Sequence, residues 1–149
     1  MSAEPTAGVD AGHETPRVLP AITPLNAEFW SGGRNGELRI RRCQACGFWT
    51  HPPRPMCPRC HGRDLPFETA SGHGTVYSFV VNHYPWRPGL RLPYIVAVVE
   101  LDEQPDLRLT TNIAGCEPAD MRIGMRVEVV FEQQDDAFIP LFRPRESVT

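Results

Sequence analysis

The chain has 149 residues, 41% of them hydrophobic, which suffices for one domain or two small ones with an apolar core. No apolar run approaches the roughly 20 residues of a membrane span, and the chain begins without the charged-then-apolar pattern of a secretory signal. We therefore expect a cytoplasmic protein that does not associate with a membrane. The net charge of −3 is unevenly distributed, since residues 34–63 carry seven arginines against one acid and residues 100–136 carry ten acids against three arginines.

The beginning of the chain predicts a tail followed by a short helix. Residues 1–22 mix Pro, Gly, Ala, Glu and Thr without apolar periodicity, as disordered segments do. In residues 23–36, Thr23 suits an N-cap and Pro24 the first helical position, so we expect a helix over residues 24–34 that ends near several glycines. Phe29 and Trp30 on this helix either pack on their own domain or bind a partner protein.

Two Cys-x-x-Cys pairs dominate residues 37–70. Cys43 and Cys46 form the first pair, which follows a predicted strand over residues 38–42, and Cys57 and Cys60 form the second. Such spacing places four thiolates about 2.3 Å from one zinc ion. Gly47 and Gly62 follow the pairs and supply backbone freedom for the turns. Four thiolates fill the coordination shell, so the pattern predicts a structural zinc site.

Other ligands and pairings are less consistent with the sequence. His51 and His61 lie near the cysteines, but four thiols already complete a tetrahedral shell. Disulfides are the competing explanation for two Cys-x-x-Cys pairs. However, Cys116 makes the number of cysteines odd, and we find no secretory signal. We interpret Cys116 as a small buried hydrophobic residue.

Residues 71–143 predict a small β-barrel. Five short segments rich in β-branched and aromatic residues, with one helical turn at 117–121 between the third and fourth, cover residues 75–82, 94–101, 107–113, 126–132 and 137–142. This order matches the five-stranded OB-fold, and an open meander is the alternative. The fold class is therefore mainly β: an N-terminal helix, a rubredoxin-like zinc ribbon and an OB-fold barrel, with residues 144–149 as a tail.

The first two barrel strands are apolar on both faces. In the first, we expect one face to carry Tyr77, Phe79 and Val81, and the other to carry Val76, Ser78 and Val80. The second places Ile95, Ala97 and Val99 opposite Tyr94, Val96 and Val98. Because only one face can form the core of a small barrel, the outer face must meet the ribbon, the helix or another protein.

The connection over residues 83–93 combines aromatic residues, arginines and prolines. Its composition is enriched at recognition surfaces, although a plain Pro-rich connection explains it equally well. With the flanking residue 94, it contributes five candidate partner-binding residues: Tyr84, Trp86, Arg87, Arg91 and Tyr94. The sequence contains no Ser-His-Asp, paired-carboxylate or phosphate-binding glycine motif, so we expect a chain that is not an enzyme by itself.

The order of these parts resembles a family of rubredoxin-like zinc-ribbon plus OB-fold proteins, a domain of unknown function associated with acyl-CoA, thiolase and lipid-transfer-protein-like enzymes. The resemblance covers residues 24–143. It rests on Phe29-Trp30 and on residues 38–43, 52–57, 74–79, 112–116 and 122–125.

The resemblance implies an accessory, non-catalytic subunit that is required by a carbon–carbon lyase or thiolase. The partner would be a thiolase-fold or lipid-transfer-protein-like aldolase subunit in a heterotetramer, for instance in steroid side-chain degradation, with Phe29 and Trp30 among the partner contacts. It also implies that acyl-CoA is shared with the partner. Four ribbon residues, Arg39, Arg41, Phe48 and Trp49, would then contact the nucleotide end of CoA.

An alternative function is binding of single-stranded nucleic acid, because OB-folds stack bases on aromatic side chains. The acidic second half of the chain argues against a groove that follows a phosphate backbone.

Overall fold

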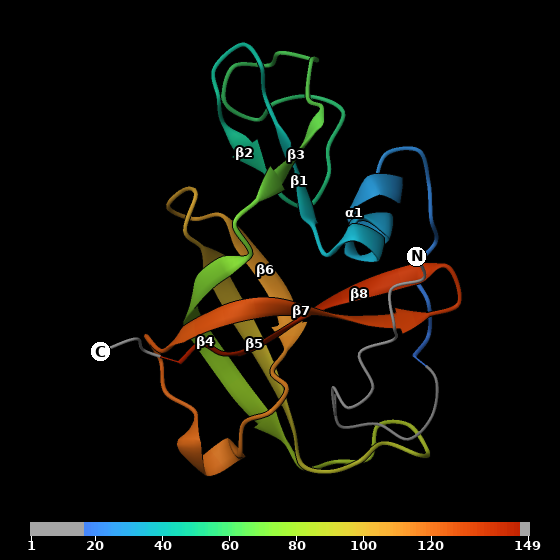
Figure 1. Ribbon diagram of the computed structural model, residues 1–149, viewed down its shortest axis with the longest axis vertical. Helices are drawn as coiled ribbons and strands as arrows, with labels where there is room; N and C mark the ends of the chain where they lie inside the picture. Colours follow the sequence, from blue (N-terminus) through green and yellow to red (C-terminus); the bar gives the residue numbers. More distant parts are fainter. Residues whose placement is uncertain (1–16, 147–149) are drawn as a thin grey trace.

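The computed structural model describes residues 17–146 and is mainly β, with a short helix, a ribbon and a barrel (Figure 1). This architecture confirms the predicted fold class. Residues 1–16 and 147–149, predicted as parts of the two tails, lie outside the described residues. Over residues 17–146, no helix combines the length and the apolar character needed to cross a membrane.

The N-terminal helix is shorter than predicted. Helix α1 (Ala27–Ser31) continues into the 3₁₀ helix η1 (Gly32–Asn35), which ends at Gly36 with φ of 70°. The start is delayed because the Asn26 side chain holds a turn, accepting a hydrogen bond from the Thr23 N–H at 2.8 Å and donating one to the Ala21 carbonyl at 3.1 Å. Phe29 is buried in the core of the chain.

The ribbon sheet is antiparallel, with the order β2-β1-β3. Its strands are β1 (Leu38–Arg42), β2 (Trp49–Thr50) and β3 (Phe67–Ala70). Strand β1 buries Leu38 and Ile40 and leaves Arg39 and Arg41 half-buried, as alternation requires. We did not predict β2 and β3, because strands of two and four residues are too short to show a period.

The barrel has the strand order β6-β5-β4-β7-β8. It comprises β4 (His73–Asn82), β5 (Tyr94–Leu101), β6 (Arg108–Asn112), β7 (Arg126–Gln134) and β8 (Ala137–Pro144). A parallel bridge between Ile113 and Phe142 brings the end of β6 against β8, and the Thr111 hydroxyl donates to the Pro140 carbonyl at 3.0 Å. The 3₁₀ turn η2 (Pro118–Asp120) joins β6 to β7. This connectivity is that of an OB-fold.

The observed faces of β4 differ from the predicted ones because the strand contains a β-bulge. The register against β5 shifts between Val76 and Ser78, so the alternation reverses at this point. Val76 is buried and Tyr77 is 49% exposed, whereas Phe79 and Val81 pack against the core. The prediction that Tyr77 shares a face with Phe79 and Val81 is therefore wrong. Strand β5 alternates without interruption, and of its two apolar faces the one with Ile95, Ala97 and Val99 is buried.

Candidate functional site

The four paired cysteines converge at the tip of the ribbon. The sulfur atoms of Cys43, Cys46, Cys57 and Cys60 all lie within 4.8 Å of one another. The Cys43–Cys60 and Cys46–Cys57 sulfur separations are 3.5 and 3.7 Å. A tetrahedral zinc–thiolate centre with bonds of about 2.3 Å has edges of about 3.8 Å, close to these two separations, so the cluster is suited to a zinc ion.

The backbone of the ribbon supports negative charge on these sulfurs. Arg59 and Gly62 donate their N–H groups at 3.4 Å to the Cys57 and Cys60 sulfurs. Burial raises the pKa of Cys57, but the N–H groups of Cys60 and Arg59 outweigh this effect and hold that pKa at about 7. The Gly62 N–H lowers the pKa of Cys60, but the Cys43 and Cys46 thiols raise it to about 12. A bound cation would favour the thiolate form of these sulfurs.

The two glycines after the cysteine pairs have different roles. Gly47 adopts φ of 79°, as expected for the turn. In the second turn, His61 takes the left-handed conformation with φ of 64°. Gly62 instead relieves crowding, because a Cβ at this position would lie 3.2 Å from the Cys60 sulfur and 3.3 Å from the Cys43 sulfur.

The ribbon residues expected to contact CoA are engaged within the chain. The Arg41 guanidinium donates to the Leu25 carbonyl at 3.0 and 3.2 Å and to the Leu65 carbonyl, and it lies 4.5 Å from the centroid of the Phe67 ring. Arg39 donates to the Thr69 hydroxyl at 2.8 Å and to the Phe67 carbonyl at 3.0 Å. Both arginines therefore join β1 to neighbouring segments of the chain.

The two adjacent aromatic residues of the ribbon are also structural. Trp49 is 8% exposed, with the Arg42 guanidinium 4.9 Å from its ring centroid. Phe48 packs against Cys43, Cys57 and Leu65 beneath the metal cluster. The structure therefore does not place Arg39, Arg41, Phe48 and Trp49 around one open pocket.

A groove instead crosses β6 between the N-terminal segment and the connection over residues 83–93. Its larger part is a cavity of about 560 Å³, and its smaller part, of about 330 Å³, extends toward Phe29 and His51. We call it the β6 groove. The residues that line the larger part include Arg17, Trp30, Arg87, Tyr94, Asn112 and Ile139. The face of the second and third strands, here β5 and β6, is the usual ligand-binding face of an OB-fold.

The β6 groove unites residues that are far apart in the sequence. Trp30, Arg87 and Tyr94, predicted as partner contacts, lie around the larger cavity. Arg17, which we had assigned to the tail, donates its Nε to Glu132 at 3.1 Å and its Nη1 to Asn112 at 3.0 Å. No sequence pattern predicted that Arg17 meets Asn112, because their proximity depends on how the N-terminal segment packs against the barrel.

His51 lines the smaller part of the β6 groove rather than the metal cluster. Its ring centroid is 4.9 Å from that of Phe29, and burial lowers the pKa of His51 to about 4. Phe29 itself is 5% exposed and is therefore unavailable to a partner in this conformation. Phe29 and Trp30 were expected either to pack on their own domain or to bind a partner protein. Phe29 packs on its own domain, whereas Trp30 is half-buried at the β6 groove.

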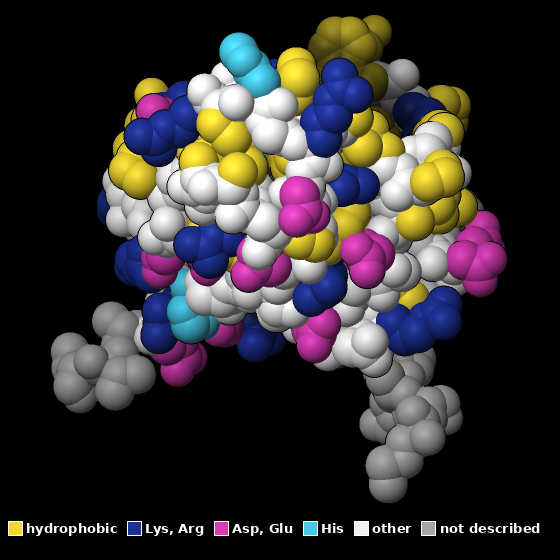
Figure 2. All heavy atoms as spheres, turned by 90° about the horizontal axis from the view of Figure 1, so that it is seen from above, with side chains coloured by type: hydrophobic (Ala, Val, Ile, Leu, Met, Phe, Trp, Pro, Cys, Tyr) yellow, Lys and Arg dark blue, Asp and Glu magenta, His cyan; other side chains and the backbone are white. Residues whose placement is uncertain are grey.

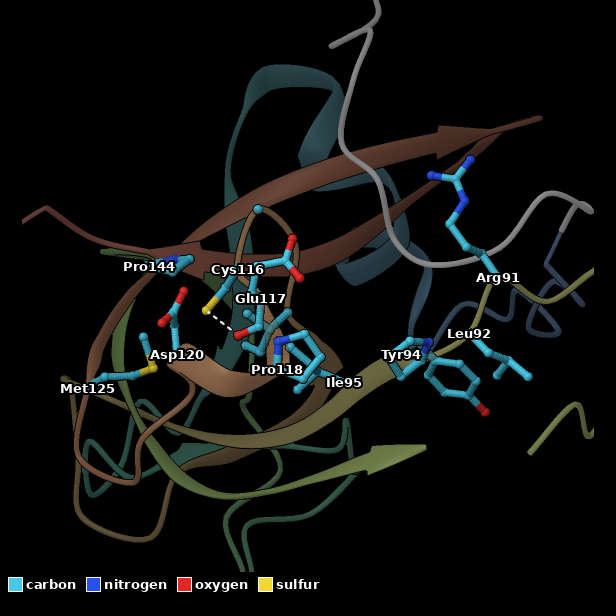
Figure 3. A pocket seen from close by; sticks show the side chains of 13 residues that line it. Arg91, Leu92, Tyr94, Ile95, Cys116, Glu117, Pro118, Asp120, Met125 and Pro144 are labelled. Carbon is cyan, nitrogen blue, oxygen red and sulfur yellow. Dashed lines mark hydrogen bonds between the residues drawn. The ribbon is translucent and has the colours of Figure 1, made fainter. Parts of the chain in front are cut away.

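The barrel end contains a second hollow, beside the 3₁₀ turn η2. This cavity of about 590 Å³ has Arg91, Leu92 and Tyr94 on one side and Cys116, Asp120 and Met125 on the other (Figure 3). Burial, followed by the charges of Asp120 and Glu117, raises the pKa of the Cys116 thiol. Cys116 is half-buried here and donates its S–H to the Glu117 carbonyl at 3.4 Å.

Comparison with known proteins identifies both parts of the chain. Residues 30–66 match the family described as "ChsH2, rubredoxin-like zinc ribbon domain", and residues 67–132 match "ChsH2, C-terminal OB-fold domain". The solved "Ltp2-ChsH2(DUF35) aldolase" contains a chain with 41% identity and a TM-score of 0.74; the similarity covers 85% of the present chain and 98% of that one.

Two curated relatives extend the comparison. A "DUF35 domain-containing scaffold protein" of Methanocaldococcus jannaschii is 40% identical over 71% of this chain and 80% of the relative. The "3-oxo-4,17-pregnadiene-20-carboxyl-CoA hydratase alpha subunit" of Mycobacterium tuberculosis is 36% identical over 85% of this chain. The present chain spans only 40% of the length of that hydratase subunit.

Proposed function

The chain belongs to the DUF35 family of ChsH2-type zinc-ribbon and OB-fold proteins, and from this membership we propose that it is an accessory, non-catalytic subunit of an acyl-CoA-processing complex. The observation that carries the proposal is the similarity over 98% of the DUF35 chain in a solved aldolase.

The partner in this proposal is a thiolase-fold, lipid-transfer-protein-like aldolase or thiolase, and the complex is a heterotetramer with two copies of each chain. The partner supplies the catalytic residues. The similarity to a pregnadiene-carboxyl-CoA hydratase subunit supports a steroid side chain as the acyl group. The connection over residues 83–93, with Tyr84, Trp86 and Arg91, provides partner contacts on this chain.

The metal in the proposed complex is a structural zinc ion bound by Cys43, Cys46, Cys57 and Cys60. A filled four-thiolate shell offers no position for a substrate, so the ion would supply rigidity and no chemistry. It would hold the two turns of the ribbon together above the β1–β3 sheet.

We place the acyl-CoA contact in the β6 groove rather than on the ribbon arginines. Arg87 is half-buried, lines the larger cavity and forms no ion pair or hydrogen bond with any other described residue, so its guanidinium is available for a phosphate. Trp30 and Tyr94 add aromatic surface beside it, suited to an adenine ring. Arg41, in contrast, already donates to two carbonyl groups of the chain.

Nucleic-acid binding is the weaker candidate. Seen from the ribbon end, arginine side chains are interspersed with acidic ones and do not form a continuous basic stripe (Figure 2). A groove that follows a phosphate backbone requires such a stripe.

The test is co-expression of this chain with the thiolase-fold protein encoded beside it. We expect one complex by size-exclusion chromatography with light scattering, and calorimetric binding of acyl-CoA that weakens about tenfold in Arg87→Ala. Arg63→Ala is the matched control, because Arg63 is exposed and lies outside the β6 groove. Separate elution of the two proteins, or a salt-dependent gel shift with oligonucleotides by this chain alone, would contradict the proposal.

A further inference from the structure

The connection between β4 and β5 presents a pair of aromatic side chains to solvent. Tyr84 is 61% and Trp86 is 72% exposed, and their ring centroids are 4.7 Å apart with an angle of 59° between the planes. Val80, two residues before the end of β4, is also exposed, at 62%. Large apolar side chains exposed together mark interaction sites more often than isolated ones do.

The pair is held in place by one residue, Asn82. The Asn82 side-chain oxygen accepts a hydrogen bond from the Trp86 indole N–H at 2.7 Å, and its amide donates to the Tyr84 carbonyl at 2.7 Å. The Trp86 backbone N–H also donates to the Tyr84 carbonyl, at 3.0 Å. The indole donor is therefore satisfied within the chain, and the two rings are ordered before any partner binds. Ordering a side chain in advance removes an entropic cost from association.

The charge beside the pair indicates the kind of partner. Residues 83–93 contain Arg87, Arg91 and His83 and no acidic residue, within a chain of net charge −3. Exposed Trp, Tyr and Arg are also the residue types that dominate binding energy at protein interfaces. A complementary surface would combine an apolar pocket for the two rings with acidic residues at its rim.

We infer that Tyr84 and Trp86 form a preformed anchor, positioned by Asn82, that inserts into an apolar, acid-rimmed pocket of the thiolase-fold partner. This inference rests on the proposed function and specifies the surface through which the chain associates. Asn82 is a positioning residue, since it acts through the orientation of the two rings.

The test measures association by calorimetry between the full chain and the copurified thiolase-fold protein. Trp86→Ala should weaken binding at least tenfold, as expected for an interface anchor. Asn82→Ala should weaken it about fivefold without removing either ring. Asn82→Asp keeps the acceptor for the indole but sets a carboxylate against the Tyr84 carbonyl and beside the acidic rim, so it should weaken binding at least as much as Asn82→Ala. Ile123→Ala is the matched control, because Ile123 is a large apolar residue that is 70% exposed and lies outside residues 83–93.

A second readout separates positioning from a general loss of structure. In the free chain, the indole N–H of Trp86 should exchange with solvent faster in Asn82→Ala than in the wild type, with an unchanged melting temperature. Wild-type affinity in both Trp86→Ala and Asn82→Ala would overturn the anchor and leave the proposed function standing. If the wild-type chain does not bind the partner at all, both proposals fail. Loss of self-association in Trp86→Ala would identify a second copy of this chain as the occupant and overturn the inference.

Discussion

The side-chain amide of Gln104 brackets the backbone of Trp49. Its oxygen accepts a hydrogen bond from the Trp49 N–H at 2.9 Å, and its nitrogen donates to the Trp49 carbonyl at 3.0 Å. Trp49 belongs to the ribbon strand β2, and Gln104 lies in the turn between the barrel strands β5 and β6. One glutamine thus replaces the strand neighbour that the edge of β2 lacks, and it joins the ribbon to the barrel.

We predict that Gln104→Ala lowers the free energy of unfolding by about 1–3 kcal/mol, because two partly buried hydrogen bonds are lost. Urea denaturation followed by tryptophan fluorescence measures the change. Gln104→Glu should not restore the lost stability, since its carboxylate accepts from the Trp49 N–H but repels the Trp49 carbonyl oxygen. Gln133→Ala, at an exposed glutamine of β7, is the control and should be neutral. Equal stability of Gln104→Ala and the wild type would show that the hydrogen bonds between Gln104 and Trp49 do not stabilise the fold.

The cysteine cluster predicts about one zinc ion per chain. Cys57→Ser should abolish zinc binding, measured by atomic emission, and should unfold residues 38–65, since a structural zinc contributes on the order of 10 kcal/mol to a small ribbon. Cys116→Ser is the matched control because Cys116 lies outside the cluster and should leave the zinc content unchanged. Full zinc content in Cys57→Ser, or loss of zinc in Cys116→Ser, would show that the ligands are misassigned.

Acid should destabilise the fold through His51. Burial lowers the pKa of His51 in the folded chain from its ordinary value of 6.5 to about 4. Between these values the unfolded chain binds a proton that the folded chain does not, so stability should decrease as the pH falls from 6.5 toward 4. The decrease is at most about 1.4 kcal/mol per pH unit.

The check compares urea denaturation of the wild type and His51→Phe at several pH values. Phenylalanine preserves a ring beside Phe29 and removes the titrating group, so the difference between the two proteins should grow as the pH falls. Any acid-induced loss of zinc is common to both proteins and cancels in this difference. The exposed His83 provides the control substitution, His83→Phe, whose pH dependence should match the wild type. A difference that stays constant with pH would exclude His51 as the source.

Arg41 should matter for stability rather than for ligand binding. Arg41→Ala removes hydrogen bonds to the Leu25 and Leu65 carbonyls and the contact with the Phe67 ring, and we expect a loss of about 2–3 kcal/mol in urea denaturation. Arg41→Lys should recover only part of the loss, because an ammonium lacks the planar fork that reaches both carbonyls. Acyl-CoA affinity of the folded variant should match that of the wild type. A large loss of acyl-CoA affinity without a loss of folding stability would indicate that Arg41 binds the ligand.

Features set by neighbouring residues were predictable from the sequence. The spacing of Cys43, Cys46, Cys57 and Cys60 determines the cluster, because each pair lies within one turn of the backbone. The alternation in β5 separated its two faces, and the order of the five strands identified the OB-fold. Each of these depends on local backbone geometry, which the side-chain pattern reports directly.

Contacts between distant segments were decided only by the tertiary structure. The bulge at Tyr77 reverses which side chains of β4 point toward the core. The alternating side-chain pattern of the strand gives no sign of this reversal. The Arg41 guanidinium finds carbonyl groups at Leu25 and Leu65, which occupy no fixed spacing from it. The β6 groove likewise assembles Arg17, Trp30, Arg87, Tyr94 and Asn112 from five segments. The sequence determines which chemical groups are present, whereas closure of the barrel and packing of the N-terminal segment determine which of them meet.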